Sequence, residues 1–294
     1  HWEKDTAPYS LAYAQAVTVT TPYNEYMYLI GGGGVKLSSD SDPIIEQSPR
    51  VMYAPLNADG TLGDWEEADD LPIKLHGASA TAVDGLIYVL GGLYFSPGEA
   101  IPKFSNKAYC AKINPDGTFD TYEWKHQTNN WDLFSNWESG VAYHATIVIN
   151  DRIYIIGGFR RKAYFNQTWH LTRFVLSAKL NLDGECQDLN WEVNPIEDNS
   201  LPRLMNHTAV GIEISETDQT NQTKDYIYVM GGEVWEPCDS GDACQDRAIT
   251  KRLSAAVFRA EIGGESGVSV GPWENLGDFT MGGGLHLMTA VRTG

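Results

Sequence analysis

The sequence predicts an all-β protein made of repeated four-stranded sheets, and two observations support this prediction. The first is a short β-branched and aromatic run that ends in two glycines, as in Tyr26-Met27-Tyr28-Leu29-Ile30-Gly31-Gly32. Such a run has the composition of a buried strand, and paired glycines suit a strand end that needs positive φ or leaves no room for a Cβ atom. The run occurs four times, with its first glycine at Gly31, Gly91, Gly157 and Gly231.

The second observation is that three further segments accompany each copy of this run. An apolar segment precedes it, and a third strand-like segment follows it after a variable loop. Three of the third segments lead into Asp-Gly pairs, at Asp59, Asp116 and Asp183, and Asp-Gly is a hairpin signal. A fourth segment in each unit carries a tryptophan at a matching distance: Trp65, Trp124, Trp191 and Trp273. Four antiparallel strands per unit, repeated along a chain, are typical of propeller blades.

The Gly-Gly run, the tyrosine of the third strand (Tyr53 and Tyr109) and the later tryptophan resemble the kelch repeat. The segment from Ala54 to Trp65 is more similar to prokaryotic or extracellular kelch-like proteins than to intracellular adaptors. The resemblance covers nearly the whole chain and implies a kelch-type β-propeller with four complete four-stranded blades. These blades are expected at residues 10–66, 76–125, 141–192 and 204–274.

Both ends of the chain predict partial blades. Trp2 stands where the fourth strand of an earlier blade is expected, and residues 285–291 match the first strand of a further blade. The ends would then supply only first and fourth strands and would leave an open sheet edge, which promotes aggregation. We therefore expect residues 1–294 to form one β-propeller domain that is part of a ring of six or seven blades.

The charge of the chain restricts its partners. It has 21 basic and 39 acidic residues, a net charge of −18, which disfavours nucleic acids and anionic membranes. No apolar run approaches the roughly 20 residues that span a bilayer. The acidic excess indicates either a solubilising surface or a cation-binding role. Residues 39–42 and 239–242 offer oxygens to Ca²⁺ but lack the spacing of a calcium loop, so neither a cofactor nor a metal is expected.

The cysteines and the sequons indicate an oxidising compartment. Cys238 and Cys244 flank a short polar loop, and we expect a disulfide between them. Cys110 lies in a third strand and Cys186 in the turn after the next one, so they either pair between blades or leave Cys110 buried and free. Three Asn-x-Thr sequons are candidate glycosylation sites: Asn166, Asn206 and Asn221. These features together predict a secreted or cell-surface glycoprotein.

Function is expected in the loops, because the strands form the scaffold. In kelch-like propellers the second-to-third loops and the inter-blade loops emerge on one face. Aromatic rings among amides and carboxylates suit protein or sugar recognition, although such rings also pack loops into small satellite cores. The candidate binding residues come from blades 3 and 4 and from the loop before blade 3: Trp131, Phe134, Trp137, Phe159, Arg160, Arg161, Phe165, Trp169, His170 and Trp235. The two arginines can pair with carboxylates, so the expected ligand is an acidic carbohydrate or a carboxylate-rich protein, including another copy of this chain.

Three histidines share one position near the start of the first strand: His144, His207 and His286. Converging histidines can bind a metal, but the equivalent residues in the other blades are Ala14 and Ala78, and no carboxylate accompanies the set. We therefore prefer a structural role, in which each histidine contacts the neighbouring blade.

The sequence thus favours a non-catalytic binding or structural module outside the cell. The alternative is the propeller domain of a secreted enzyme, similar to the copper-radical galactose oxidases or the sialic acid mutarotases. No covalent Tyr–Cys pair or other catalytic motif can be assigned, so an enzyme is the less favoured hypothesis. An intracellular ligase adaptor would need partner domains outside this sequence and conflicts with a disulfide.

Overall fold

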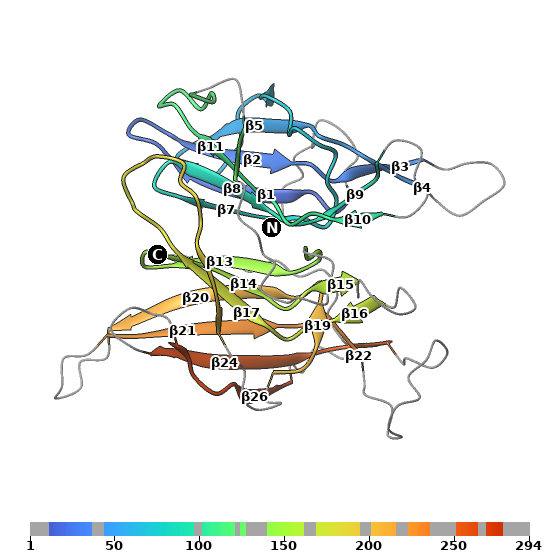
Figure 1. Ribbon diagram of the computed structural model, residues 1–294. Helices are drawn as coiled ribbons and strands as arrows, with labels where there is room; N and C mark the ends of the chain where they lie inside the picture. The colour runs from blue at the N-terminus through green and yellow to red at the C-terminus, as the bar shows by residue number, and fades with distance from the viewer. Residues whose placement is uncertain are drawn as a thin grey trace. The chain divides into compact units, whose positions relative to one another are not determined.

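The computed structural model describes residues 12–36, 44–96, 102–120, 124–127, 140–161, 169–194, 201–215, 223–235, 251–263 and 269–278. In these ranges every regular secondary-structure element is a β-strand, which confirms the predicted all-β fold (Figure 1). No helix in the described part of the chain has the length and apolarity to span a membrane. The strands fall into two compact units, residues 1–130 with 181–188 and residues 131–180 with 189–294.

The first unit contains two four-stranded antiparallel sheets, which we call blades 1 and 2. Blade 1 has the order β1-β2-β5-β6, with bounds Gln15–Thr20, Glu25–Ile30, Val51–Leu56 and Glu66–Glu67. Blade 2 has the order β7-β8-β11-β12, with bounds Ser79–Val83, Leu86–Leu90, Ala108–Lys112 and Lys125–Gln127. Within each blade, the four strands therefore pair in the order in which they occur along the chain.

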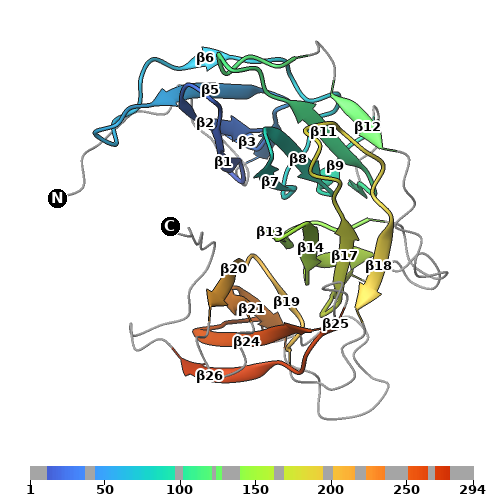
Figure 2. The same ribbon diagram turned by 90° about the vertical axis from the view of Figure 1, so that its left-hand side faces the viewer.

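The second unit contains two further sheets, blades 3 and 4. Blade 3 has the order β13-β14-β17-β18, with bounds Ala145–Ile149, Arg152–Ile156, Val175–Lys179 and Trp191–Asn194. Blade 4 comprises β20, β21, β24 and β26, with bounds Thr208–Ser215, Thr223–Met230, Ala256–Gly263 and Glu274–Asp278. The short strand β25 (Ser269–Val270) also pairs with β24, and Figure 2 shows β26 beside β24. Four complete four-stranded blades are thus present, whereas Trp2 and residues 285–291 lie outside the described residues.

A small two-stranded ribbon follows the Gly-Gly pair of every blade. The ribbons are β3–β4 (Gly33–Lys36, Ile44–Gln47), β9–β10 (Leu93–Tyr94, Lys103–Phe104), β15–β16 (Phe159–Arg161, Trp169–Leu171) and β22–β23 (Glu233–Trp235, Lys251–Leu253). A further short strand, β19 (Leu204–Met205), pairs with β22. The sequence indicated only variable loops at these places, because two to four residues are too few to show a strand period. We call the end of each blade that bears its ribbon the ribbon end.

The Gly-Gly pairs meet both conditions that the sequence suggested. The first glycine of each pair has φ between 62° and 68°, and the second has φ between 84° and 102°. A Cβ atom on Gly32 would lie 2.7 Å from the amide nitrogen of Ala14, and one on Gly158 would lie 2.9 Å from the carbonyl oxygen of Ala142. The second glycine therefore allows the strand end to pack against the start of the first strand in its own blade.

The core of each unit lies between the faces of its two blades. In the first unit Val17, Tyr28 and Tyr53 pack with Ile87 and Tyr109, and in the second a cluster of the same kind joins blades 3 and 4. Trp124 and Trp273 are each 5% exposed and belong to these two clusters. Trp191 opens β18, while Trp65, Trp124 and Trp273 stand directly before β6, β12 and β26. The tryptophans therefore mark the entry to the fourth strand rather than its middle.

Candidate functional site

The ribbon of blade 3 gathers five of the predicted binding residues. Its register pairs Phe159 with Leu171, Arg160 with His170, and Arg161 with Trp169. The ribbon is fixed at its base, because the Phe159 amide donates to the Ala142 carbonyl at 2.8 Å and the Ala142 amide donates back at 3.0 Å. Residues that are eight to twelve positions apart in the chain are thus paired at the ribbon end of blade 3.

Arg160 is a buried member of this group, with 5% of its surface exposed. Its Nε donates a hydrogen bond to the carbonyl oxygen of Gly140 at 3.1 Å, and its guanidinium carbon lies 5.4 Å from the centre of the Phe174 ring. The hydrogen bond and the cation–π contact hold together the segment before β13, the ribbon and the start of β17. The sequence does not predict this burial, because Arg160 follows Gly-Gly closely, where a variable loop is expected. Its contact with a ligand stays a prediction.

Phe159 stands next to a residue with unusual backbone geometry. Its ring centre lies 6.4 Å from that of Tyr143, and Tyr143 has φ of 56°. The equivalent residues of the other blades also have positive φ: Tyr13 at 59°, Gly77 at 64° and Asn206 at 54°. Such a conformation costs a non-glycine residue roughly 1 kcal/mol, and its recurrence in all four blades makes it a feature of the repeat. The sequence contains no signal of this conformation, since three different residue types occupy the position: tyrosine, glycine and asparagine.

The remaining predicted residues are only partly described. Trp235 is the last residue of β22 and pairs with Lys251 of β23. Four binding candidates lie outside the described residues, and so do the predicted cysteine pair and two of the sequons: Trp131, Phe134, Trp137, Phe165, Cys238, Cys244, Asn166 and Asn221. These positions stay predictions.

The third sequon is described, and its acceptor nitrogen is already engaged. The Nδ2 of Asn206 donates a hydrogen bond to Oε1 of Glu233 at 3.1 Å. The next two residues of the sequon, His207 and Thr208, are 6% and 7% exposed. A glycan on Asn206 would therefore have to displace a contact of the folded protein, whereas glycosylation during synthesis would meet no such obstacle. Glycosylation at this residue stays a prediction.

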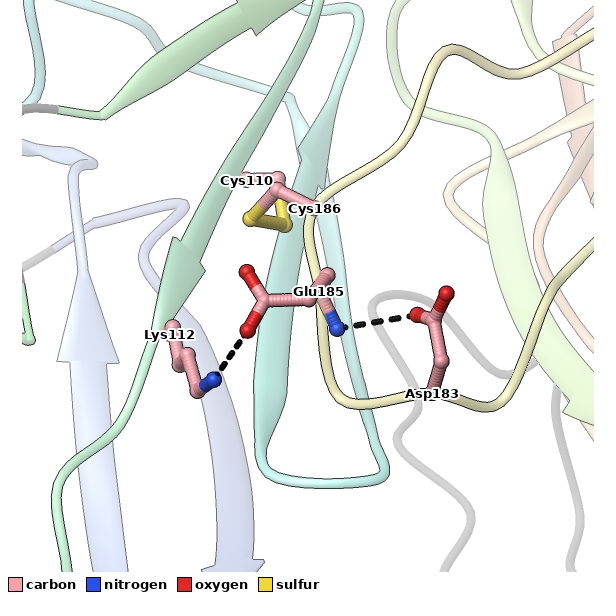
Figure 3. Close-up of a disulfide and its surroundings, with 5 residues drawn as sticks. All are labelled: Cys110, Lys112, Asp183, Glu185 and Cys186. Atoms are coloured by element: carbon pink, nitrogen blue, oxygen red, sulfur yellow. Dashed lines mark hydrogen bonds and ion pairs between the residues drawn. A yellow bond between two sulfur atoms is a disulfide. The ribbon is translucent and has the colours of Figure 1, made fainter.

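A disulfide joins Cys110 and Cys186, which settles the two alternatives left open for these residues (Figure 3). Their Cα atoms are 5.8 Å apart, and the bond closes a sequence separation of 76 residues. It connects β11 of blade 2 to residues 181–188, which belong to the first unit although β17 and β18 on either side belong to the second. An ion pair between Lys112 and Glu185 lies beside it, and the Glu185 amide donates to Asp183 Oδ1 at 3.1 Å.

His144 and His207 are both buried, and His207 contacts the neighbouring blade as the sequence favoured. Each is 6% exposed, and burial lowers the pKa of each imidazole to about 3. His207 lies over the end of β14 in blade 3, because a Cβ atom on Gly157 would come within 2.9 Å of its Cε1 atom. The histidine thus fills the space that a glycine leaves in the neighbouring blade. Among the described residues no group of three metal-ligating side chains is present, and His286 lies outside them.

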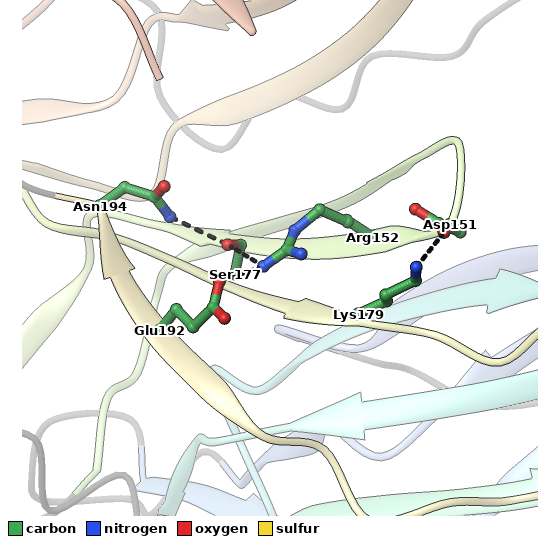
Figure 4. A network of polar contacts seen from close by, with 6 residues as sticks. All are labelled: Asp151, Arg152, Ser177, Lys179, Glu192 and Asn194. Atoms are coloured by element: carbon green, nitrogen blue, oxygen red, sulfur yellow. Dashed lines mark hydrogen bonds and ion pairs between the residues drawn. The ribbon is translucent and has the colours of Figure 1, made fainter. Parts of the chain in front are cut away.

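A buried arginine crosses blade 3, and sequence reasoning missed it (Figure 4). Arg152 is 3% exposed, and its Nη2 donates to Ser177 Oγ at 3.1 Å and to Glu192 Oε2 at 2.5 Å. Asn194 Nδ2 also donates to Ser177 Oγ, at 3.0 Å. Three strands, β14, β17 and β18, are therefore joined by side chains in addition to their backbone ladders. The one available signal was an arginine at the start of an otherwise apolar strand.

Comparison with known proteins points to one kind of repeat. No protein-family model matches the chain. Kelch-like protein terF of Aspergillus terreus is 28% identical over 172 residues, which cover 58% of this chain and 30% of that protein. N-acetylneuraminate epimerase 1 of Escherichia coli is 29% identical over 99 residues, covering 33% of this chain and 26% of that protein. Kelch-like protein 38 of Mus musculus is 22% identical over 187 residues, covering 51% of this chain and 30% of that protein.

The matched segments thus span less than a third of each of these curated relatives. The solved structure of YjhT superimposes with a TM-score of 0.54 at 15% identity, covering 94% of this chain and 72% of that one. At this identity the likeness concerns the fold alone. The Gly-Gly runs, the four four-stranded sheets and these matches together support the predicted kelch-type β-propeller fold.

Proposed function

We propose that this chain is a non-catalytic binding module, and that it recognises a carboxylate-rich partner protein through the ribbon end of blade 3. The register of ribbon β15–β16 carries this proposal, because it sets Arg161 opposite Trp169 and Arg160 opposite His170. Arginine with aromatic residues is the composition that dominates the energetics of protein interfaces. Arginine also binds carboxylates through two parallel hydrogen bonds, which favours an acidic partner.

Two properties of the ribbon support a binding role. It is held rigidly at its base by the Phe159 and Ala142 hydrogen bonds and by the buried Arg160, and a rigid platform loses little entropy when it binds. It also carries Arg161 in a chain with a net charge of −18, so acidic surfaces of other copies are themselves a candidate ligand. An acidic carbohydrate is the other ligand of the same chemistry.

We further propose that the protein works in an oxidising compartment, secreted or at the cell surface. The disulfide between Cys110 and Cys186 supports this location, because structural disulfides persist mainly outside the cytosol.

The binding proposal is tested with an oligo-glutamate peptide titrated into the protein at low ionic strength. Replacing Arg161 with glutamine should weaken binding about tenfold, as expected for one lost charge-assisted contact. The matched control is Lys179→Gln, which removes the same charge from blade 3 at the other end of the sheet. Lys179 is 65% exposed and pairs with Asp151, so its loss should leave the fold intact. Equal weakening by both variants would show non-specific charge attraction and would overturn the proposal.

The similarity to N-acetylneuraminate epimerase 1 favours one second candidate, the propeller of an enzyme that acts on an acidic sugar. This candidate is tested by following the exchange between the two anomers of N-acetylneuraminate by NMR. Faster exchange in the presence of the protein would establish catalysis and replace the binding-module proposal. An unchanged rate, with retained binding of the acidic peptide, is the outcome that we expect.

A further inference from the structure

The connection between β1 and β2 in blade 1 is longer than those of blades 2 and 3 and carries an exposed ring. Four residues, 21–24, join β1 to β2, whereas two residues join β7 to β8 and two join β13 to β14. Tyr23 in this connection is 79% exposed, the highest value among the large apolar side chains of the described residues. The two additional residues of this turn thus place a phenol ring in solvent at the end of blade 1 opposite its ribbon end.

The Asp-Gly turn of blade 2 is seated against this connection. Thr21 Oγ1 donates a hydrogen bond to the carbonyl oxygen of Pro115 at 3.1 Å, and the buried Tyr28 hydroxyl donates to the carbonyl oxygen of Gly117 at 2.6 Å. Gly117 has φ of 87°, and a Cβ atom on it would lie 2.6 Å from the ring of Tyr26. A larger residue at this position would be strained and would displace the Tyr26 ring, so glycine suits the turn that lies between the two blades.

Asp116 is a fixed carboxylate at the edge of this turn. The backbone amide and the hydroxyl of Thr118 both donate to Asp116 Oδ1, at 3.0 Å and 2.6 Å. These bonds lower the pKa of the carboxyl group, so it is ionised at neutral pH. Both bonds reach Oδ1, and Oδ2 is thus the atom through which the carboxylate can meet a ligand.

A shallow, solvent-open pocket of about 430 Å³ is lined by residues of the two turns, and we call it the turn pocket. It is lined by Tyr23, Asn24, Tyr26, Asn114, Pro115 and Asp116. We propose that the turn pocket binds the side chain of an arginine or lysine from a basic partner protein. The faces of aromatic rings attract cations, and a carboxylate pairs with them directly. Among the described residues that line the pocket the one formal charge is that of Asp116, and the acidic chain as a whole attracts cations.

Other ligands fit this chemistry less well. An anion would be repelled by Asp116, and a metal ion would find one carboxylate without the further carboxylate, histidine or cysteine ligands that it needs. A neutral sugar can stack on the tyrosines but gains nothing from the charge. The turn pocket lies at the opposite end of β2 from Gly31, where the ribbon of blade 1 begins, and its lining shares no residue with the ribbon of blade 3.

The test is an NMR titration of the intact protein with three small probes: acetyl-Gly-Arg-Gly-amide, the same peptide with neutral citrulline in place of arginine, and methyl β-glucopyranoside. The arginine peptide should bind at least about tenfold more tightly than the citrulline peptide, and Asp116→Asn and Tyr23→Ala should each remove about tenfold in affinity. Tyr23→Ala changes an exposed residue and should leave the fold intact.

Asp59→Asn is the matched control for the carboxylate. Asp59 makes the same two bonds in the Asp-Gly turn of blade 1, to Thr61 at 3.0 Å and 2.7 Å, but does not line the pocket. This variant should weaken its turn to the same extent and leave arginine binding unchanged. Equal binding of the citrulline peptide, preferred binding of the glucoside, absence of binding at millimolar concentration, or insensitivity to Tyr23→Ala would each overturn the proposal.

Discussion

At the scale of single residues, the two glycines of a pair are required by close contacts with different neighbours. A Cβ atom on the first would meet the adjacent blade of the same unit, as Gly31 would meet the Leu75 carbonyl oxygen at 3.3 Å and Gly157 would meet His207. A Cβ atom on the second would meet the first strand of its own blade, as at Gly158. The first glycine thus allows close packing between two blades, and the second allows close packing between strands of one blade.

Replacing Gly158 with alanine should destabilise the protein by about 3 kcal/mol or more. Its φ of 102° is unfavourable for alanine, and the new Cβ would lie 2.6 Å from Val141 Cγ2 and 2.9 Å from the Ala142 carbonyl oxygen. Gly85→Ala is the control, because Gly85 has φ of 71° but open space around it, and its cost should be about 1 kcal/mol. Equal losses in denaturant unfolding would show that backbone strain alone explains the conserved use of glycine within these repeats.

The two buried histidines should make stability depend on pH. The pKa of each is about 3 in the folded protein and about 6.5 when unfolded, so the unfolded state binds more protons between these values. Stability is then fully present above about pH 6.5 and falls as the pH drops toward 3. Between pH 7 and pH 5 each histidine should remove about 2 kcal/mol from the free energy of unfolding.

The measurement compares denaturant unfolding at the two pH values for the native chain and for His207→Gln. The variant should lose about 2 kcal/mol less than the native chain over this interval, whatever its own stability at pH 7. The same pH dependence in both proteins would mean that His207 is not buried as a neutral ring in solution.

At the scale of elements, the strands of the four blades were predictable and the ribbons were not. Each blade strand is long enough to show its apolar composition, and Gly-Gly or Asp-Gly marks its end. The ribbons are two to four residues long and follow variable loops, so neither their pairing nor the burial of Arg160 could be predicted. The sequence also allows two alternatives for Cys110 and Cys186, a disulfide or a buried free Cys110. It does not show how a turn of one blade lies on the strand of another.

At the scale of the whole molecule, the disulfide should contribute most to stability of any single bond. Closing a separation of 76 residues restricts the unfolded chain and stabilises the fold by about 4.5 kcal/mol in the chain-entropy account. The double variant Cys110→Ala/Cys186→Ala should therefore unfold at a much lower denaturant concentration than the oxidised protein. Reduced native protein should behave like the variant, and an oxidised protein no more stable than the variant would contradict this role.

The central claim is that kelch-type blades present the ribbon of blade 3 to an acidic partner. Hydrogen–deuterium exchange with and without the oligo-glutamate peptide tests it most directly, because exchange reports which backbone segments a ligand covers. The account predicts slower exchange in 159–161 and 169–171 on adding the peptide, and clearly less protection there in Arg161→Gln at the same peptide concentration. Protection confined to other blades, or the same protection in the Arg161→Gln variant, would contradict it.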